Sequence, residues 1–196
     1  MNNYDKMLQA AQERCAEFEM AALAAKAGVE DTPEYIKTKF FGQTVLVCKA
    51  DGAMTVEGRT ASFEEALSVY DWLCDRKDNA VESGTYCTVS NLPGVFVGGK
   101  GLGMEMPKLA RRIHEAPKAF ADAMQAMGAE QLSLGDLGFR LEIFPGLSVC
   151  LKFYFGDEEF PPKLTLLWDR NMLQFVRYET VYYIAGCLHD RLITLL

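Results

Sequence analysis

Three strand-like segments follow one another near the C-terminus with no helical segment between them. They are Gly138–Phe144, Leu147–Phe155 and Leu164–Trp168. The dipeptide Pro145-Gly146, which is typical of a type II turn, separates the first two. Strands joined by short turns pair antiparallel, because a parallel pair needs a long crossover between its strands. The sequence therefore predicts an antiparallel meander in this half of the chain.

Amphipathic helices are predicted on both sides of this meander. In Asn3–Ala27 the apolar residues recur every three or four positions, and Gly28 ends the pattern. Further helices are predicted to begin at Ser62, which opens a capping box, at Pro107, at Pro117, and shortly before Val181. The expected fold class is α+β, with the C-terminal antiparallel meander packed by these helices.

The segment between the first two helices has mixed signals. Thr32-Pro33 provides a cap followed by a helical proline, which predicts a short helix through about Lys39. Gly42–Cys48 has the composition of a strand, and Met54–Val56 can return as its partner across the Asp51-Gly52 turn. A hairpin is expected here.

Length and composition indicate a single globular domain over residues 1–196, introduced by the helix at 3–27. The net charge of −7 argues against nucleic acid and acidic membranes as partners, since both require clustered basic residues. No apolar run reaches the roughly 20 residues of a membrane span, and the first residues lack the pattern of a secretory signal. The expected location is the cytoplasm.

The six cysteines have spacings that favour neither zinc nor iron–sulfur binding. They stand at positions 15, 48, 74, 87, 150 and 187, so no CxxC pair is present. Several lie within apolar patterns. Buried, reduced thiols are expected in a cytosolic protein.

An acidic turn, Gly156–Pro162, is the first candidate for a functional site. Its carboxylates are Asp157, Glu158 and Glu159, and Trp168 and Asp169 follow at the end of the next strand. These five residues are candidates for ligand binding. Carboxylates can hold a hard cation, act as acid and base, or keep a turn in solvent. Asp157 and Asp169 are the metal candidates, provided that the strands bring them together.

A glycine-rich loop is the second candidate, with Gly98, Gly99 and Lys100 as possible ligand-binding residues. Residues 94–100 match GxxxxGK, but Gly101 stands where a phosphate-binding loop needs Ser or Thr. A loop that covers a pocket is one reading, and a plain connection is the other.

No complete catalytic constellation is present. His114 and His189 are the only histidines, which excludes a site built on several of them. There is no GxSxG motif, and Cys187 and His189 are too close in a helix to face each other. The sequence does not identify a cofactor or decide whether the protein is an enzyme.

Several of these landmarks recur in one family. Phe40–Gln43, Asn91–Gly94, Met127–Ala129, Phe155–Pro161 and Leu166–Asp169 occur in that order before Tyr178-Glu179 and the last helix. In this the chain resembles the uncharacterised prokaryotic family called "domain of unknown function 3786", over residues 40–196. The resemblance implies a bacterial or archaeal source, mostly anaerobic, and points to the acidic turn and the glycine-rich loop without assigning an activity.

Three functions remain open. The preferred one is a cytosolic domain that binds a small molecule or cofactor in a pocket near the glycine-rich loop and the acidic turn. The second is a carboxylate-based enzyme, with or without a divalent metal. The third is a protein-interaction or accessory module, and a homo-oligomer is compatible with all three.

Overall fold

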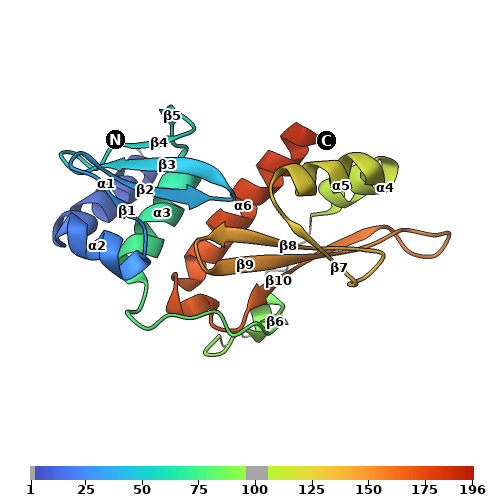
Figure 1. Ribbon diagram of the computed structural model, residues 1–196. Helices are drawn as coiled ribbons and strands as arrows, with labels where there is room; N and C mark the ends of the chain where they lie inside the picture. The colour runs from blue at the N-terminus through green and yellow to red at the C-terminus, as the bar shows by residue number, and fades with distance from the viewer. Residues whose placement is uncertain (1–2, 96–105) are drawn as a thin grey trace.

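The computed structural model describes residues 3–95 and 106–196. Within these ranges the chain forms six α-helices and two antiparallel sheets of five strands each (Figure 1). The α+β class and the C-terminal meander are confirmed. The sheet in the N-terminal half, which we call the first sheet, extends the single hairpin that the sequence predicts there.

The N-terminal helical segment is two helices rather than one. Helix α1 spans Asn3–Ala16 and α2 spans Met20–Ala27. The α-helix is interrupted between them. There the N–H groups of Glu17 and Phe18 donate to carbonyls only three residues back, those of Arg14 and Cys15, and form a tight turn. Gly28 ends α2 in the left-handed region with φ of 69°, as the sequence predicts.

The first sheet has the strand order β1-β2-β3-β4-β5. These strands are Glu30–Asp31, Tyr35–Phe40, Gln43–Cys48, Met54–Val56 and Arg59–Thr60. The helix predicted through Lys39 is wrong, because β2 occupies that segment. Its alternate residues Ile36, Thr38 and Phe40 are buried, and this two-residue period outweighs the helix-start signal before it.

The second sheet has the order β6-β10-β9-β8-β7. These strands are Tyr86–Cys87, Lys163–Asp169, Leu147–Tyr154, Leu137–Phe144 and Glu130–Leu132. The turn at Gly146 joins β8 to β9, and β9 pairs with β10 from Tyr154↔Lys163 to Val149↔Trp168. The acidic turn therefore lies at one end of the β9–β10 pair, where it projects from the molecule (Figure 1).

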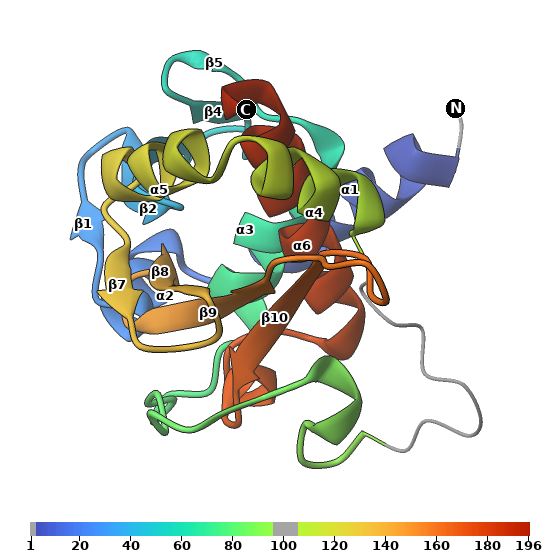
Figure 2. The same ribbon diagram turned by 90° about the vertical axis from the view of Figure 1, so that its right-hand side faces the viewer.

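Four further helices pack against the sheets. They are α3 (Phe63–Asp75), α4 (Pro107–Glu115), α5 (Pro117–Ala126) and α6 (Tyr178–Leu195). The capping box predicted at Ser62 and Glu65 is present at the start of α3. Helix α6 runs through the middle of the molecule in both views and contacts α3, α4 and α5 (Figure 1 and Figure 2). Of the helices in the described ranges, not one combines the length and the apolar character that crossing a bilayer requires.

One hydrophobic core joins the two sheets. Phe144, at the end of β8, stacks on Trp72 of α3 with ring centroids 4.6 Å apart and on Phe40 of β2 at 4.8 Å. The N–H of Phe41 donates to the carbonyl of Ile143 at 2.8 Å, so the β2–β3 turn is bonded to the edge of the second sheet. The sheets are thus fixed to each other by core packing and by a backbone hydrogen bond.

Candidate functional site

In the acidic turn, one of the three carboxylates accepts hydrogen bonds from the backbone of the turn itself. Asp157 Oδ1 accepts hydrogen bonds from the N–H of Phe160 at 2.8 Å and from that of Glu159 at 2.9 Å. These backbone bonds, with that of Phe160 the largest, lower the pKa of Asp157. Glu158 and Glu159 are exposed. Asp157 therefore shapes the turn that carries it.

A further backbone hydrogen bond and close backbone packing also fix the shape of this turn. The N–H of Asp157 donates to the carbonyl of Phe160 at 2.9 Å. A Cβ added to Gly156 would lie 2.7 Å from the backbone nitrogen of Pro162 and 3.0 Å from the carbonyl of Phe160. Only glycine fits there, so the turn has a defined shape.

Asp169 lies at the opposite end of β10 from Asp157. Strand β10 has seven residues, Lys163–Asp169, and six steps of about 3.3 Å separate its two ends by about 20 Å. The structure therefore does not bring Asp157 and Asp169, the two metal candidates, together. The turn at Pro161-Pro162 leads into β10 at its start, and Asp169 comes only at its end.

Asp169 is instead a buried hydrogen-bond centre. Its carboxylate accepts from the N–H groups of Ser83 at 3.0 Å, Gly84 at 2.8 Å and Asn171 at 2.7 Å. It also accepts from the Ser83 hydroxyl at 2.9 Å. These bonds fasten residues 83–84 to the end of β10. Trp168 beside it is fully buried in the core.

The remaining sequence-predicted residues form no metal site that the structure describes. Across residues 3–95 and 106–196, no three His, Cys, Asp or Glu side chains are grouped so that they could hold a metal ion. Gly98, Gly99 and Lys100 lie outside the described residues. The glycine-rich loop therefore stays a prediction.

A pocket of about 500 Å³ lies beside the acidic turn, and we call it the α4 pocket. It is formed by the start of α4 and by the two segments that flank the carboxylates. Its lining residues are Met106, Pro107, Ala110, Arg111, Tyr154, Phe155, Phe160, Pro161, Pro162, Lys163 and Leu164. The α4 pocket is thus mainly aromatic and apolar, with two basic side chains.

The acidic carboxylates are not part of this lining. Asp157, Glu158 and Glu159 lie between the two segments that line the pocket. The turn brings Phe155 and Phe160, on either side of the carboxylates, to one pocket. His114 of α4 holds the start of the turn. Its ring packs edge-on against Phe155, with the ring centroids 5.8 Å apart, and its Nδ1 accepts a hydrogen bond from the N–H of Gly156 at 3.4 Å.

Sequence reasoning missed the contribution of α4. Arg111 lies more than 40 residues before the acidic turn, and no local pattern links the two. The available signal was compositional. The aromatic and proline residues on both sides of the turn are more than an exposed turn needs, and Phe160 remains 66% exposed.

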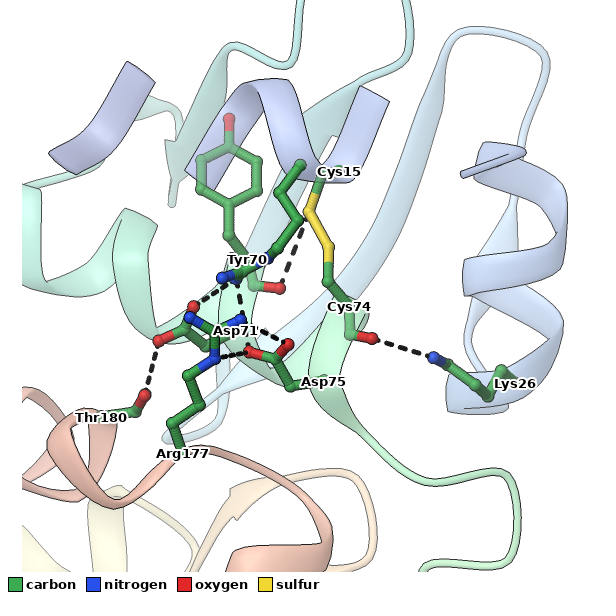
Figure 3. A network of polar contacts seen from close by, with 9 residues as sticks. Cys15, Lys26, Tyr70, Asp71, Cys74, Asp75, Arg177 and Thr180 are labelled. Carbon is green, nitrogen blue, oxygen red and sulfur yellow. Dashed lines mark hydrogen bonds and ion pairs between the residues drawn. A yellow bond between two sulfur atoms is a disulfide. The ribbon is translucent and has the colours of Figure 1, made fainter. Parts of the chain in front are cut away.

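A second polar cluster ties three helices together (Figure 3). Asp71 of α3 accepts from Arg14 of α1 and from the Thr180 hydroxyl of α6, each at 2.5 Å. Asp75 pairs with Arg177 at 2.8 Å and with Arg14 at 3.3 Å. All of these carboxylate contacts are made within the protein, so we interpret the cluster as structural.

A disulfide joins Cys15 of α1 to Cys74 of α3 beside this cluster (Figure 3). The expectation of reduced thiols throughout is therefore wrong for these two residues. Their separation of 59 residues left no local signal, and only the packing of α1 on α3 brings them together. The other four cysteines are free thiols.

The fold and the site define an α+β protein with two antiparallel sheets and an aromatic pocket at one end of the second. The chain belongs to the family described as "Domain of unknown function (DUF3786)", whose model matches residues 19–191. The match includes α2 and begins earlier than the expected residue 40. Searches of curated proteins and of solved structures found no match.

Proposed function

We propose that this protein binds a small, mainly apolar molecule with an acidic group in the α4 pocket. The pocket itself is the observation that supports this proposal. Its volume of about 500 Å³ lies within the roughly 300–1,000 Å³ of ordinary ligand pockets. Its apolar lining with a few charged groups is also typical of such sites.

Exposed aromatic surface supports the proposal further. Tyr154, Phe155 and Phe160 are among the most exposed large apolar residues of the described chain. Leaving such rings in water forgoes about 1.5–3 kcal/mol for each that could be buried fully. A ligand in the α4 pocket would cover part of this surface, which provides a driving force for binding.

The charge of the lining favours an acidic ligand. Although the whole chain has a net charge of −7, the charged side chains among the described residues that line the α4 pocket are Arg111 and Lys163. The guanidinium of Arg111 can hold a carboxylate through two parallel hydrogen bonds. A long-chain or aromatic carboxylate therefore fits this pocket better than the corresponding alcohol.

A titration with decanoate and decanol, followed by amide NMR of the full chain, tests the proposal. Decanoate should shift the amides of Ala110, Phe155 and Leu164 and bind more tightly than decanol. Arg111→Gln should weaken decanoate binding about tenfold, since loss of a charge-assisted hydrogen bond costs about 1.5 kcal/mol or more. Lys108→Gln, on the same helix but outside the lining, is the control and should leave the affinity unchanged.

Two results would count against this function. One is equal binding of decanoate and decanol, which would remove the role of the basic residues. The other is the absence of shifts around the pocket at saturating probe.

Phe160 favours a second candidate function, a protein-interaction module. It is 66% exposed on the projecting β9–β10 connection, as an anchor residue for a partner would be. Phe160→Ser distinguishes the two. It should abolish capture of a partner if Phe160 is the anchor, whereas decanoate binding would fall only modestly, since most of the pocket remains.

We also propose a cytoplasmic location, which the four free thiols support. The Cys15–Cys74 disulfide provides the test. A reducing compartment would hold these two residues as thiols, and the bond seen in the structure would then form only once the protein meets an oxidant outside the cell. Cells lysed directly into an alkylating reagent should yield protein with six labelled cysteines. Only four labelled cysteines would indicate an oxidising compartment and overturn the proposed location.

A further inference from the structure

A second pocket, of about 600 Å³, lies where the C-terminal half of α6 meets the β2–β3 turn. We call it the Arg191 pocket. The start of α3 and the end of α5 complete its walls, which include Phe40, Phe41, Gln43, Arg59, Ser62, Glu65, Met127, Cys187 and Arg191. It shares no lining residue with the α4 pocket.

Arg191 is a partly buried arginine that has a backbone carbonyl, and no carboxylate, as its partner among the described residues. Its guanidinium is partly buried, and its Nη1 donates to the carbonyl of Phe41 at 2.6 Å. Arg14, Arg59, Arg140 and Arg177 each pair with a carboxylate within 4.0 Å. Among the described residues Arg191 has no such partner, and neither do Arg76, Arg111, Arg112 and Arg170, but of these five only Arg191 lines this pocket. Burial lowers the pKa of Arg191, which reflects the cost of keeping this cation partly out of water.

Three of the four nearby carboxylates have other partners, and the fourth, Glu64, lines the pocket with its side chain exposed to solvent. Glu65 accepts from both terminal nitrogens of Arg59, at 2.6 and 2.7 Å, and from the N–H of Ser62 at 2.8 Å. Glu57 accepts from the N–H of Thr44. Asp190, which precedes Arg191 on α6 and also lines the pocket, contacts His189 and has a side chain that is 84% exposed. No described carboxylate therefore accepts from the guanidinium of Arg191, and its N–H groups beyond the one bonded to Phe41 can donate to a ligand.

The uncharged part of the pocket suits the apolar body of a small organic molecule. Phe40, Phe41 and Met127 supply apolar walls, and Gln43 adds an amide. Burial raises the pKa of the Cys187 thiol well above its usual range, so this side chain stays neutral and is not a nucleophile. These groups can bind a ligand, but they include no nucleophile that would react with it.

We propose that the Arg191 pocket binds a small organic carboxylate, held by the free guanidinium nitrogens of Arg191 against the wall formed by Phe40 and Phe41. Two parallel N–H···O bonds from a planar guanidinium match the geometry of a carboxylate. The anion would supply a carboxylate in direct contact with the guanidinium, which Glu57 and Glu65 affect only through their charge. This site is separate from the proposed function of the α4 pocket.

Benzoate and benzamide, which have the same shape but differ in charge, are the probes. In amide NMR titrations of the full chain, benzoate should shift Gln43, Gly186 and Arg191. Benzamide should bind at least fivefold more weakly. Arg191→Gln should reduce benzoate binding about tenfold. Arg112→Gln is the matched control, because Arg112 also donates to one backbone carbonyl, that of Ile193 at 2.8 Å, yet is exposed.

The bond from Arg191 to Phe41 could make the glutamine variant unstable, so Arg191→Lys provides a second test. Lysine keeps the charge and a donor for Phe41 but loses the paired geometry, and benzoate should bind at least threefold more weakly. Equal affinities of benzoate and benzamide, or no shifts at these amides, would overturn the proposal. Shifts around Phe155 alone would support the α4 pocket and refute this one.

Discussion

Cys15 and Cys74 join a helix outside the family-matched residues to a helix inside them. Cys15 belongs to α1, which ends before residue 19, where the match begins, and Cys74 lies near the end of α3. Arg14, next to Cys15, adds ion pairs to Asp71 and Asp75 of the same helix. The N-terminal helix is thus fixed to the family domain by one covalent bond and two ionic contacts.

Loss of this disulfide should lower the free energy of unfolding substantially. Closing a loop of 59 residues removes conformational entropy from the unfolded chain worth roughly 4 kcal/mol. The double variant Cys15→Ala/Cys74→Ala should therefore unfold at much lower urea than the oxidised protein. Wild type unfolded in excess dithiol should behave like the double variant.

Cys48→Ala is the control for this measurement, because Cys48 is a free thiol on β3. Dithiol should lower its midpoint as much as that of wild type. A double variant as stable as oxidised wild type would show that α1 and α3 stay associated without the bond.

Asp71 should be the most sensitive position of the cluster between the three helices. Its side chain is buried and accepts from Arg14 and Thr180. Asp71→Ala leaves both donors without their partner, and removing one member of a buried ion pair costs about 3–5 kcal/mol. Since Arg14 is partly exposed, a loss of about 2–3 kcal/mol in urea unfolding is expected.

Glu130→Gln is the comparison for Asp71. Glu130 pairs with Arg140 at 2.6 Å, but both side chains are about half exposed, so its loss should change stability by less than about 0.5 kcal/mol. Similar losses at the two positions would contradict the role assigned to burial.

Local patterns in the sequence predict much of this fold. Ser62 and Glu65 form the predicted capping box, and Pro145-Gly146 joins the predicted strands. The error at Tyr35–Phe40 arose where two local signals competed. A cap and a proline favoured a helix, whereas the alternation of buried and exposed residues in that segment fits a strand. The segment is a strand because it pairs with β1 on one side and β3 on the other.

The site was less predictable because its parts are distant in sequence. The acidic turn drew attention through Asp157, yet that carboxylate serves the turn, and the pocket is formed by its aromatic neighbours and by Arg111. The Arg191 pocket had no sequence signal at all. A cation without a partner is recognised only when the positions of every nearby carboxylate are known.

Asp157 should make the stability of the protein depend on pH in acid. Its pKa in the folded state is lowered, by backbone hydrogen bonds from Phe160 first and Glu159 second, below the ordinary value of 3.8. The ionised form is therefore favoured by folding. Its contribution is complete well above pH 3.8 and is lost as the pH falls through the folded pKa. The free energy of unfolding should be measured with urea between pH 6 and 3 for wild type and for Asp157→Asn. The difference between the two proteins should be largest well above pH 3.8 and should shrink as the pH falls below 3.8. A difference that stays constant over this range would contradict the assignment.

Gly156→Ala should disturb the turn and, through it, the α4 pocket. The new Cβ would lie 2.7 Å from both the backbone nitrogen and Cδ of Pro162, neither of which can rotate away. The turn must shift, at a cost of about 1–3 kcal/mol for overpacking. Because Phe155 and Pro162 both line the pocket, decanoate affinity should fall together with stability.

Gly146→Ala separates these two effects. Gly146 has a φ of 77° with no atom within 4 Å of an added Cβ, so the substitution strains only the β8–β9 turn, by about 1 kcal/mol. It should lower the midpoint of urea unfolding without changing decanoate binding. If Gly156→Ala binds decanoate like wild type, the shape of the acidic turn does not determine the pocket. If both variants lose affinity equally, the loss reflects general destabilisation and not the contact between Gly156 and Pro162.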